Sequence, residues 1–254
     1  MPQLNPMCLE GRRILVTGAS SGIGRAAAEL AAELGASVVL SARRADALEE
    51  ARRAMANPDA HTVVAGDLAD AAFAKSLPSA AAAGSTLDGF VHAAGICRAM
   101  PAGVVAERQL EESMKVNYFA FMLMMGEFAK GKLAGNGFSA VAVSSVSSQA
   151  GWAGGSLYAG SKGALDAAVR SLAVELAPKG MRVNAVLPSN IRTPLSAALA
   201  AAAGDDAAAA LAARHPLGFG EPRQVAAAIA FLLGDAASFV TGAALPVDGG
   251  YLAG

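Results

Sequence analysis

The stretch Arg13-Ile14-Leu15-Val16-Thr17-Gly18-Ala19-Ser20-Ser21-Gly22-Ile23-Gly24 decides the fold of this 254-residue chain. It begins as an apolar, β-branched run typical of a buried strand, and an alanine-rich helix follows from Arg25. Between them, Gly18 permits a tight turn, Gly22 lets the backbone approach a pyrophosphate, and Gly24 allows close helix-to-strand packing. A helix N-terminus there offers N–H groups and partial positive charge to phosphates. The stretch therefore predicts a nucleotide-binding loop in preference to a merely structural turn. The residues of this loop are Gly18, Ser20, Ser21, Gly22, Ile23 and Gly24.

The alternation of strand and helix continues along the chain. Apolar runs predict strands at 13–17, 37–41, 62–65, 89–93, 140–144, 182–186 and 243–247. Periodic segments predict helices near 22–34, 45–56, 70–82, 106–133, 158–177 and 222–233. Strands that are apolar throughout are buried on both faces, as in a parallel sheet. We therefore expect one α/β domain over residues 1–254, a doubly wound Rossmann fold whose seven-stranded parallel sheet carries helices on both faces.

Composition excludes several classes of function. The formal net charge of −1 argues against nucleic acid or an anionic membrane as a partner. Cys8 and Cys97 belong to no CxxC or Cys/His cluster, which predicts reduced thiols in the cytoplasm. His61, His92 and His215 have no ligand spacing, so we expect no metal site. The N-terminal segment lacks a signal-peptide pattern, and no apolar run is long enough to span a membrane.

The end of the second predicted strand predicts which dinucleotide binds. A site that prefers NAD usually places an acidic residue here against the ribose 2′-hydroxyl, but this position is Ala42. Arg43 and Arg44 follow, and a guanidinium suits a 2′-phosphate because it donates paired hydrogen bonds. We therefore predict NADP(H) as cofactor. The alternative is that the two arginines merely lie at the start of the next helix, with their side chains in solvent.

A second group of residues carries acid–base chemistry. Tyr158 and Lys162 are four residues apart and share one face of a helix, so the ammonium can lie beneath the phenol. A nearby positive charge favours the phenolate and lowers the phenol pKa. Ser145 would reach in from a strand end and hold a substrate oxygen. Because Tyr-x-x-x-Lys occurs by chance on many helices, this spacing needs the nucleotide loop beside it to be informative.

These motifs, taken in order, resemble the short-chain dehydrogenase/reductase family in its single-domain form, including its 3-oxoacyl-carrier-protein reductases. The resemblance covers nearly the whole chain. It rests on the nucleotide loop, Gly66-Asp67-Leu68, Asn117, the trio Ser145, Tyr158 and Lys162, and the closing segment 231–250. The cofactor-binding set that it implies is Gly18, Ser20, Ser21, Gly22, Ile23, Gly24, Arg43, Arg44, Asp67, Leu68, Ala94, Gly95, Tyr158, Lys162, Pro188, Ile191 and Thr193.

The resemblance also implies a catalytic set, Asn117, Ser145, Tyr158 and Lys162. Ser145 would polarise a substrate carbonyl, and Tyr158 would act as general acid or base between ketone and secondary alcohol. Lys162 would lower the pKa of Tyr158 and hold the nicotinamide ribose, and Asn117 would position a water that connects Lys162 to solvent. The substrate stays open between a 3-oxoacyl thioester and another small ketone. A carrier protein would need basic residues near the mouth of the pocket, for which the candidates are Arg98, Arg108 and Arg192.

Two departures from the family pattern qualify this interpretation. The family's Asn-Asn-Ala-Gly is His92-Ala93-Ala94-Gly95 here, so Ala93 replaces an asparagine that usually ties the central strands together. Its Pro-Gly is Pro188-Ser189, where the serine can narrow the pocket or bind substrate. The departures leave room for an alternative, a catalytically silent NADP(H)-binding regulatory protein. We further expect a substrate-covering loop over about 194–220 and, by analogy with the family, a homo-oligomer that is a dimer or tetramer.

Overall fold

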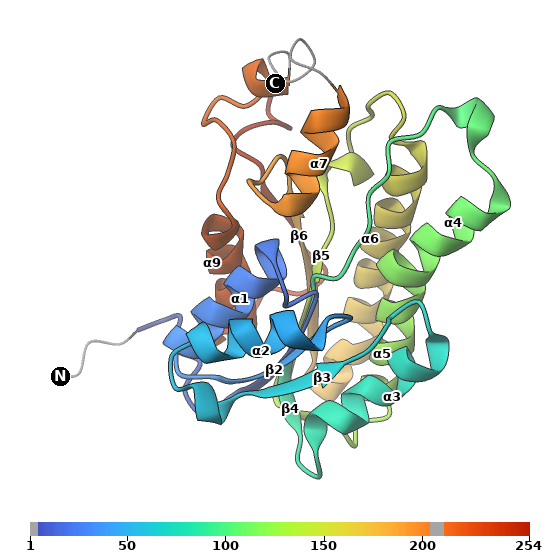
Figure 1. The fold of residues 1–254 in the computed structure, drawn as a ribbon. Helices are drawn as coiled ribbons and strands as arrows, with labels where there is room; N and C mark the ends of the chain where they lie inside the picture. Colours follow the sequence, from blue (N-terminus) through green and yellow to red (C-terminus); the bar gives the residue numbers. More distant parts are fainter. Residues whose placement is uncertain (1–4, 204–210) are drawn as a thin grey trace.

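A single parallel sheet forms the centre of the computed structural model, which describes residues 5–203 and 211–254. Its strands are β1 (Arg13–Thr17), β2 (Ser37–Ala42), β3 (Thr62–Ala65), β4 (Leu87–His92), β5 (Ala134–Val143), β6 (Arg182–Pro188) and β7 (Ala244–Val247). They lie in the order β3-β2-β1-β4-β5-β6-β7, and every neighbouring pair is parallel (Figure 1). The predicted seven-stranded, doubly wound sheet is confirmed.

The strand order reverses beside β1. The chain moves outward from β1 through β2 to β3 and then returns to the other side of β1 with β4. Loops that leave β1 and β4 therefore diverge to opposite faces and open a crevice at the carboxyl ends of these strands. Ligands of doubly wound sheets bind at this reversal point.

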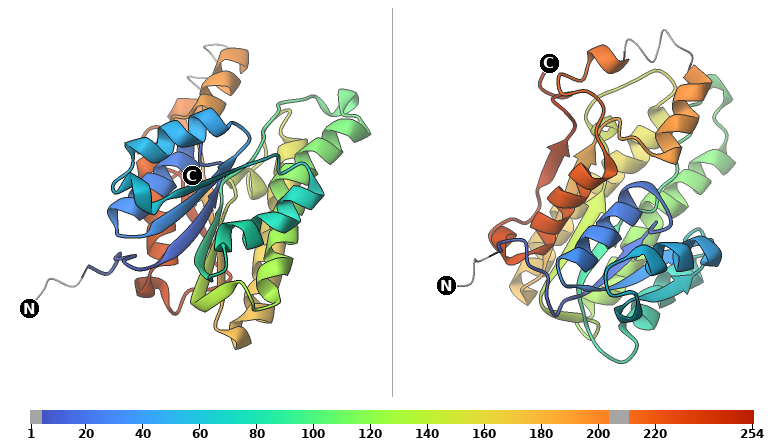
Figure 2. Two further views of the ribbon diagram at one scale, coloured as in Figure 1. Left: turned by 60° about the horizontal axis from the view of Figure 1, so that its bottom comes forward. Right: turned by 60° about the vertical axis from the view of Figure 1, so that its left-hand side comes forward.

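Helices cover both faces of the sheet (Figure 2). On one face lie α1 (Gly22–Glu33), α2 (Ala45–Ala54) and α9 (Pro222–Leu233). On the other lie α3 (Ala71–Ala82), α4 (Glu107–Met114), α5 (Ala120–Ala129) and α6 (Ser156–Leu176). A further helix, α7 (Pro194–Ala203), stands above the carboxyl ends of the strands. In the part of the chain that the structure describes, no helix is long and apolar enough to cross a membrane.

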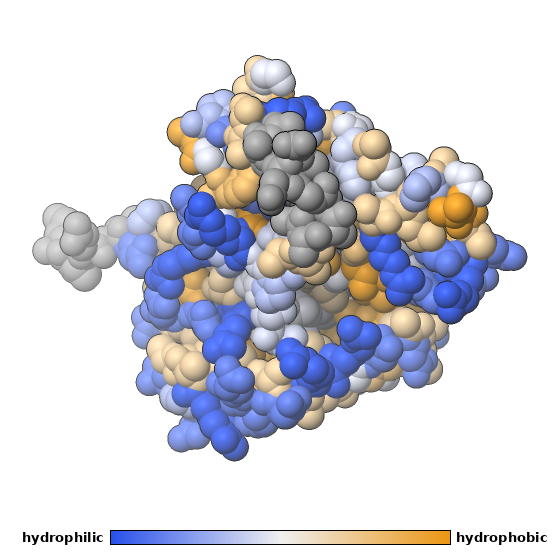
Figure 3. Space-filling view, turned by 45° about the horizontal axis from the view of Figure 1, so that its top comes forward, coloured by the Kyte–Doolittle hydropathy of each residue, from blue (hydrophilic) through white to orange (hydrophobic). Residues whose placement is uncertain are grey.

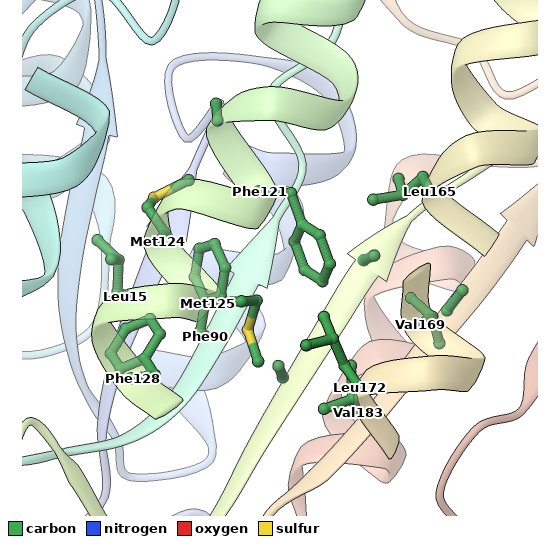
Figure 4. Packing of buried hydrophobic residues seen from close by; sticks show 14 of the residues in the cluster. Leu15, Phe90, Phe121, Met124, Met125, Phe128, Leu165, Val169, Leu172 and Val183 are labelled. Carbon is green, nitrogen blue, oxygen red and sulfur yellow. The ribbon is translucent and has the colours of Figure 1, made fainter. Parts of the chain in front are cut away.

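The core consists of two apolar layers, one on each side of the sheet. Strand side chains alternate between them, so Ile14 and Val16 pack under α1 and α9 while Leu15 faces α5. In the second layer Phe90 of β4 lies 5.4 Å from Phe128 and stacks on another α5 ring, with side chains of α6 beyond (Figure 4). This packing holds α5 and α6, the helix that carries Tyr158 and Lys162, as one block with the sheet.

The helix predicted at 106–133 is wrong in its centre and at its end. The structure has α4, then a π-helical segment at Lys115–Phe119, then α5, which stops at Ala129. In the π-helical segment the N–H of Ala120 bonds to the carbonyl of Lys115, five residues back. The segment contains Asn117, whose fully buried amide binds groups outside its own helix. These bonds fix the direction of the side chain within the π-helical segment.

Candidate active site

A cavity of about 1520 Å³ opens at the carboxyl ends of the strands, at the reversal point. Figure 3 looks onto this end of the molecule, where hydrophobic and strongly hydrophilic surface lie next to each other. Every residue of the predicted cofactor-binding set lines the cavity, as do Ser145, Tyr158 and Lys162 of the predicted catalytic set. Asn117 does not line it and lies directly behind the wall. A volume this large exceeds the space that a single small ligand needs and suits a dinucleotide with a substrate beside it.

The loop between β1 and α1 forms one end of the cavity. Gly18 has a φ of 68°, and a Cβ at this position would come within 2.7 Å of the Ala94 nitrogen, so only glycine fits between the two loops. Ser21 caps α1 in extended conformation, and its side chain makes no capping hydrogen bond. The first amides of α1 therefore remain available to an anion in the cavity, as a pyrophosphate requires.

The end of β2 provides positive charge at the same end of the cavity. Arg43 and Arg44 are exposed on its wall, and neither takes part in an ion pair within residues 5–203 and 211–254. Asp67, on the turn after β3, accepts a hydrogen bond of 3.0 Å from the Ala69 amide, which fixes its carboxylate at the cavity edge. Two unneutralised guanidinium groups here suit a 2′-phosphate.

Ser145, Tyr158 and Lys162 meet at the other end of the cavity. Ser145 follows β5, and its hydroxyl accepts a hydrogen bond of 3.1 Å from the Ser147 amide. Tyr158 and Lys162 lie one turn apart on α6, with the Lys162 Nζ 5.6 Å from the centre of the phenol ring. The ammonium also donates to the Val143 carbonyl at 2.8 Å, so it is held between α6 and the end of β5. The structure brings together the trio that the spacing predicted.

Burial dominates the electrostatics of this trio. It raises the pKa of the Tyr158 phenol, and a hydrogen bond with Ser145 acts in the opposite direction. Burial also lowers the pKa of Lys162 to about 8, although Asp166, one turn further along α6, raises it. The sequence predicted a Tyr158 pKa lowered by Lys162, and this is wrong for the protein by itself, because burial removes the phenolate from water and Cys97 acts in the same direction. A protonated phenol is the form that a general acid needs.

The Asn117 side chain ties three elements together behind the trio. Its Oδ1 accepts from the Ile96 amide at 2.8 Å, while its Nδ2 donates to the Ile96 carbonyl and to Ser161 Oγ, both at 2.9 Å. A Cβ added at Gly95 would lie 3.3 Å from Asn117 Oδ1 and 3.5 Å from Lys162 Nζ, so the two groups flank the same backbone. The structure thus gives Asn117 a positioning role, and the predicted water stays a prediction. Ser161 was missed by the sequence reasoning.

His92 supplies a tie between the central strands, beside Ala93. Its Nδ1 lies 3.1 Å from Thr17 Oγ1, and its Nε2 lies 3.2 Å from the Val116 carbonyl. Because a carbonyl can only accept, Nε2 carries the proton and Nδ1 accepts from the threonine. Burial, assisted by the charge of Lys162, lowers the pKa of His92 to about 3, so the ring is neutral. The tie that Ala93 cannot provide is therefore made by the preceding residue.

Polar and aromatic groups surround the substrate end of the cavity, and sequence reasoning missed most of them. Ser189 Oγ lies 2.7 Å from His215 Nε2, and His215 Nδ1 lies 2.7 Å from the Leu211 carbonyl. Arg214, Tyr251 and Trp152 also line the cavity. The sequence analysis considered His215 only as a metal ligand, and no local pattern marked Tyr251. The predicted covering loop includes residues 204–210, which lie outside the described residues.

Comparison with known proteins agrees with this geometry. Residues 18–252 match a family model described as enoyl-(acyl carrier protein) reductase. The chain is 40% identical to the cis-4-hydroxycyclohexanecarboxylate dehydrogenase of Sinomonas cyclohexanicum, over 95% of this chain and 97% of that protein. It is 32% identical to the 3-oxoacyl-[acyl-carrier-protein] reductase of Vibrio cholerae, over 96% of this chain and 98% of that one. A crystal structure from Beutenbergia cavernae, assigned as an NAD(P)-dependent gluconate 5-dehydrogenase with NADP bound at low occupancy, superimposes with a TM-score of 0.93 at 37% identity, over 98% of this chain and 100% of that one.

Proposed function

The chain belongs to the short-chain dehydrogenase/reductase family, and from this premise we propose that it is an NADP(H)-dependent enzyme that interconverts a small polar ketone and its secondary alcohol. Its relatives are dehydrogenases and reductases of alcohols and ketones. The observation that carries the proposal is the joining of two sites in one cavity, the nucleotide loop at one end and the Ser145, Tyr158 and Lys162 trio at the other.

The trio can do the proton chemistry of such a reaction. A bound nicotinamide supplies the hydride. Ser145 donates a hydrogen bond to the substrate oxygen and polarises the carbonyl. Tyr158, protonated because burial raises its pKa, gives its proton to the developing alkoxide. Lys162, held by the Val143 carbonyl, places a positive charge 5.6 Å from the phenol ring and stabilises the phenolate that remains.

The choice of NADP(H) rests on the end of β2. Ala42 offers no carboxylate to a ribose 2′-hydroxyl, and the next two residues, Arg43 and Arg44, place guanidinium groups on the cavity wall. A phosphate at the 2′ position would compensate this charge, whereas a hydroxyl would leave it unmatched. A relative from Beutenbergia cavernae that shares the fold holds NADP, which agrees with this choice.

A small free substrate is favoured over one carried on an acyl carrier protein. The three arginines that the sequence offered to an acidic carrier are all engaged by the chain itself. Arg98 lies 3.0 Å and Arg108 lies 3.8 Å from Glu112, and Arg192 lies 2.6 Å from Glu221. Two carboxylates offset two of these three positive charges, because Arg98 and Arg108 share Glu112, and this weakens the attraction for an acidic partner.

A spectrophotometric assay tests the proposal. NADPH is mixed with the protein and a panel of cyclic and open-chain ketones, sugars and 3-oxoacyl thioesters, and its oxidation is followed by absorbance. We expect turnover with at least one small ketone, and we expect Tyr158→Phe to abolish turnover while NADPH affinity changes less than about threefold. Tight NADPH binding without oxidation by any compound would instead support a silent NADP(H)-binding protein.

A further inference from the structure

The cavity wall carries more positive charge than a neutral substrate and its cofactor require. The cationic residues that line it are Arg43, Arg44, Arg98, Lys115, Lys162 and Arg214. Arg98 pairs with Glu112 at 3.0 Å, and Lys115 pairs with Glu111 at 2.7 Å. Lys162 belongs to the catalytic trio, and the two residues after β2 lie at the nucleotide end. Within residues 5–203 and 211–254, Arg214 alone has neither an acidic partner nor a role in the proposed chemistry.

Arg214 is held in place by an aromatic ring. Its guanidinium carbon lies 4.1 Å from the centre of the Tyr251 ring, a close cation–π contact. His215 packs on the same ring at 5.0 Å and meets Phe219 edge-on at 5.2 Å. A guanidinium that lies over a ring keeps its N–H groups at the edge of its plane, where they can donate in pairs to an oxyanion.

The segment that carries Arg214 is anchored beside the catalytic trio. The neighbouring His215 is buried, donates from Nδ1 to the Leu211 carbonyl and accepts from Ser189 Oγ, each at 2.7 Å. Ser189 directly follows β6, whose neighbour β5 leads into Ser145. The Ser144 amide bonds to the Val186 carbonyl at 2.9 Å, which holds these two strand ends together. Arg214 lines the cavity together with Tyr158, and its neighbour His215 is bonded to the strand end beside the one that leads into Ser145.

We propose that Arg214 binds a carboxylate of the substrate, which makes the substrate an oxo acid and its product a hydroxy acid. This inference rests on the proposed function and adds the class of substrate. A carboxylate accepts two parallel hydrogen bonds from one guanidinium, and Arg214, which is exposed on the cavity wall, is accessible to it. A single arginine suits a singly charged carboxylate better than a phosphate ester, which usually gathers several cations.

Matched pairs of substrates test the proposal. The probes are 4-oxocyclohexanecarboxylate, 3-oxobutanoate and 5-oxohexanoate, each beside its methyl ester, with kcat and KM measured in the presence of NADPH. The variants are Arg214→Gln and Arg214→Lys, with Arg53→Gln as control because Arg53 is an exposed arginine on α2, away from the cavity lining. Ester and acid have the same reacting carbonyl and differ in charge at the carboxyl group.

We expect the wild-type protein to prefer at least one acid over its ester in kcat/KM. Arg214→Gln should reduce kcat/KM for that acid by about 10- to 150-fold, chiefly through KM, and should leave the ester within about twofold, as expected for a lost charge-assisted hydrogen bond. Arg214→Lys should recover part of the loss, and Arg53→Gln should match the wild type.

Two results would overturn the proposal. The first is equal use of acid and ester by the wild-type protein in every pair, and the second is an equal loss for both in Arg214→Gln, which would give Arg214 a structural role. In either case ketone esters are still reduced and the proposed function stands. If no ketone is reduced, the proposed function fails, and the carboxylate site is judged by thermal shift of the NADPH complex with cyclohexanecarboxylate and its methyl ester. Equal shifts would then refute it.

Discussion

Replacing His92 by asparagine should change how the stability of the protein depends on pH. His92 is buried between β1 and the π-helical segment, and burial lowers its pKa to about 3. In the unfolded chain a histidine titrates near pH 6.5, so below that value the unfolded chain takes up a proton that the folded protein refuses. The stability associated with neutral His92 is therefore complete above pH 6.5 and is lost progressively as the pH falls towards 3.

The size of the effect follows from these two pKa values. Between them the free energy of unfolding falls by about 1.4 kcal/mol for each pH unit. From pH 7.5 to pH 5.0 the loss attributable to His92 is about 2 kcal/mol. Asparagine can keep a donor and an acceptor near Val116 and Thr17 without titrating, so His92→Asn should fold and lack this contribution.

Urea denaturation, followed by circular dichroism at pH 7.5 and pH 5.0 and at equal protein concentration, measures the free energy of unfolding of both proteins. The difference in this free energy between wild type and His92→Asn should be about 2 kcal/mol smaller at pH 5.0 than at pH 7.5. Proton uptake by every other group is common to both proteins and cancels. A difference that stays constant to within about 0.5 kcal/mol would show that His92 takes up a proton in the folded protein, and the neutral state assigned to its ring would be wrong.

Two further variants test the nucleotide end and the wall behind the trio. Arg43→Ala should weaken NADPH binding by roughly 10- to 150-fold and leave NADH binding nearly unchanged, because only NADPH carries the 2′-phosphate. Titration calorimetry measures the affinity for both dinucleotides. An unchanged NADPH affinity would mean that another residue binds the 2′-phosphate. Asn117→Ala should reduce the free energy of unfolding by about 2–4 kcal/mol and lower kcat at least tenfold, because the Ile96 amide and carbonyl lose their partner. Ser161→Ala removes a single contact of Asn117 and should show a smaller loss of both, so equal losses in the two variants would contradict the positioning role of the amide.

The sequence was most informative where the signal is local. The strand from Arg13 to Thr17 and the glycines after it could be predicted because a buried parallel strand is apolar throughout and a phosphate loop has few possible sequences. Tyr158 and Lys162 could be predicted because helical spacing alone places them on one face.

The remaining parts depend on contacts between distant residues. His215 meets Ser189 across 26 residues, and Asn117 meets Ser161 across 44, so no window of sequence contains either pair. The direction of the Tyr158 pKa shift could not be predicted from the spacing of Tyr158 and Lys162. The burial that raises this pKa comes from the whole fold. The π-helical segment escaped prediction because its residues have the same apolar pattern as an α-helix.

The π-helical segment makes the active site sensitive to chain length at one point. A π turn accommodates one residue more than an α turn, so deleting a single residue within Lys115–Phe119 would restore regular α-helical hydrogen bonding. Because a π turn absorbs its extra residue locally, α4 and α5 would keep their orientation, and the core residues of α5 would still face inward. The change would fall on the side chains within the segment, and the amide of Asn117 would lose the direction that brings it to Ile96. A one-residue deletion at this point would accordingly separate folding from activity.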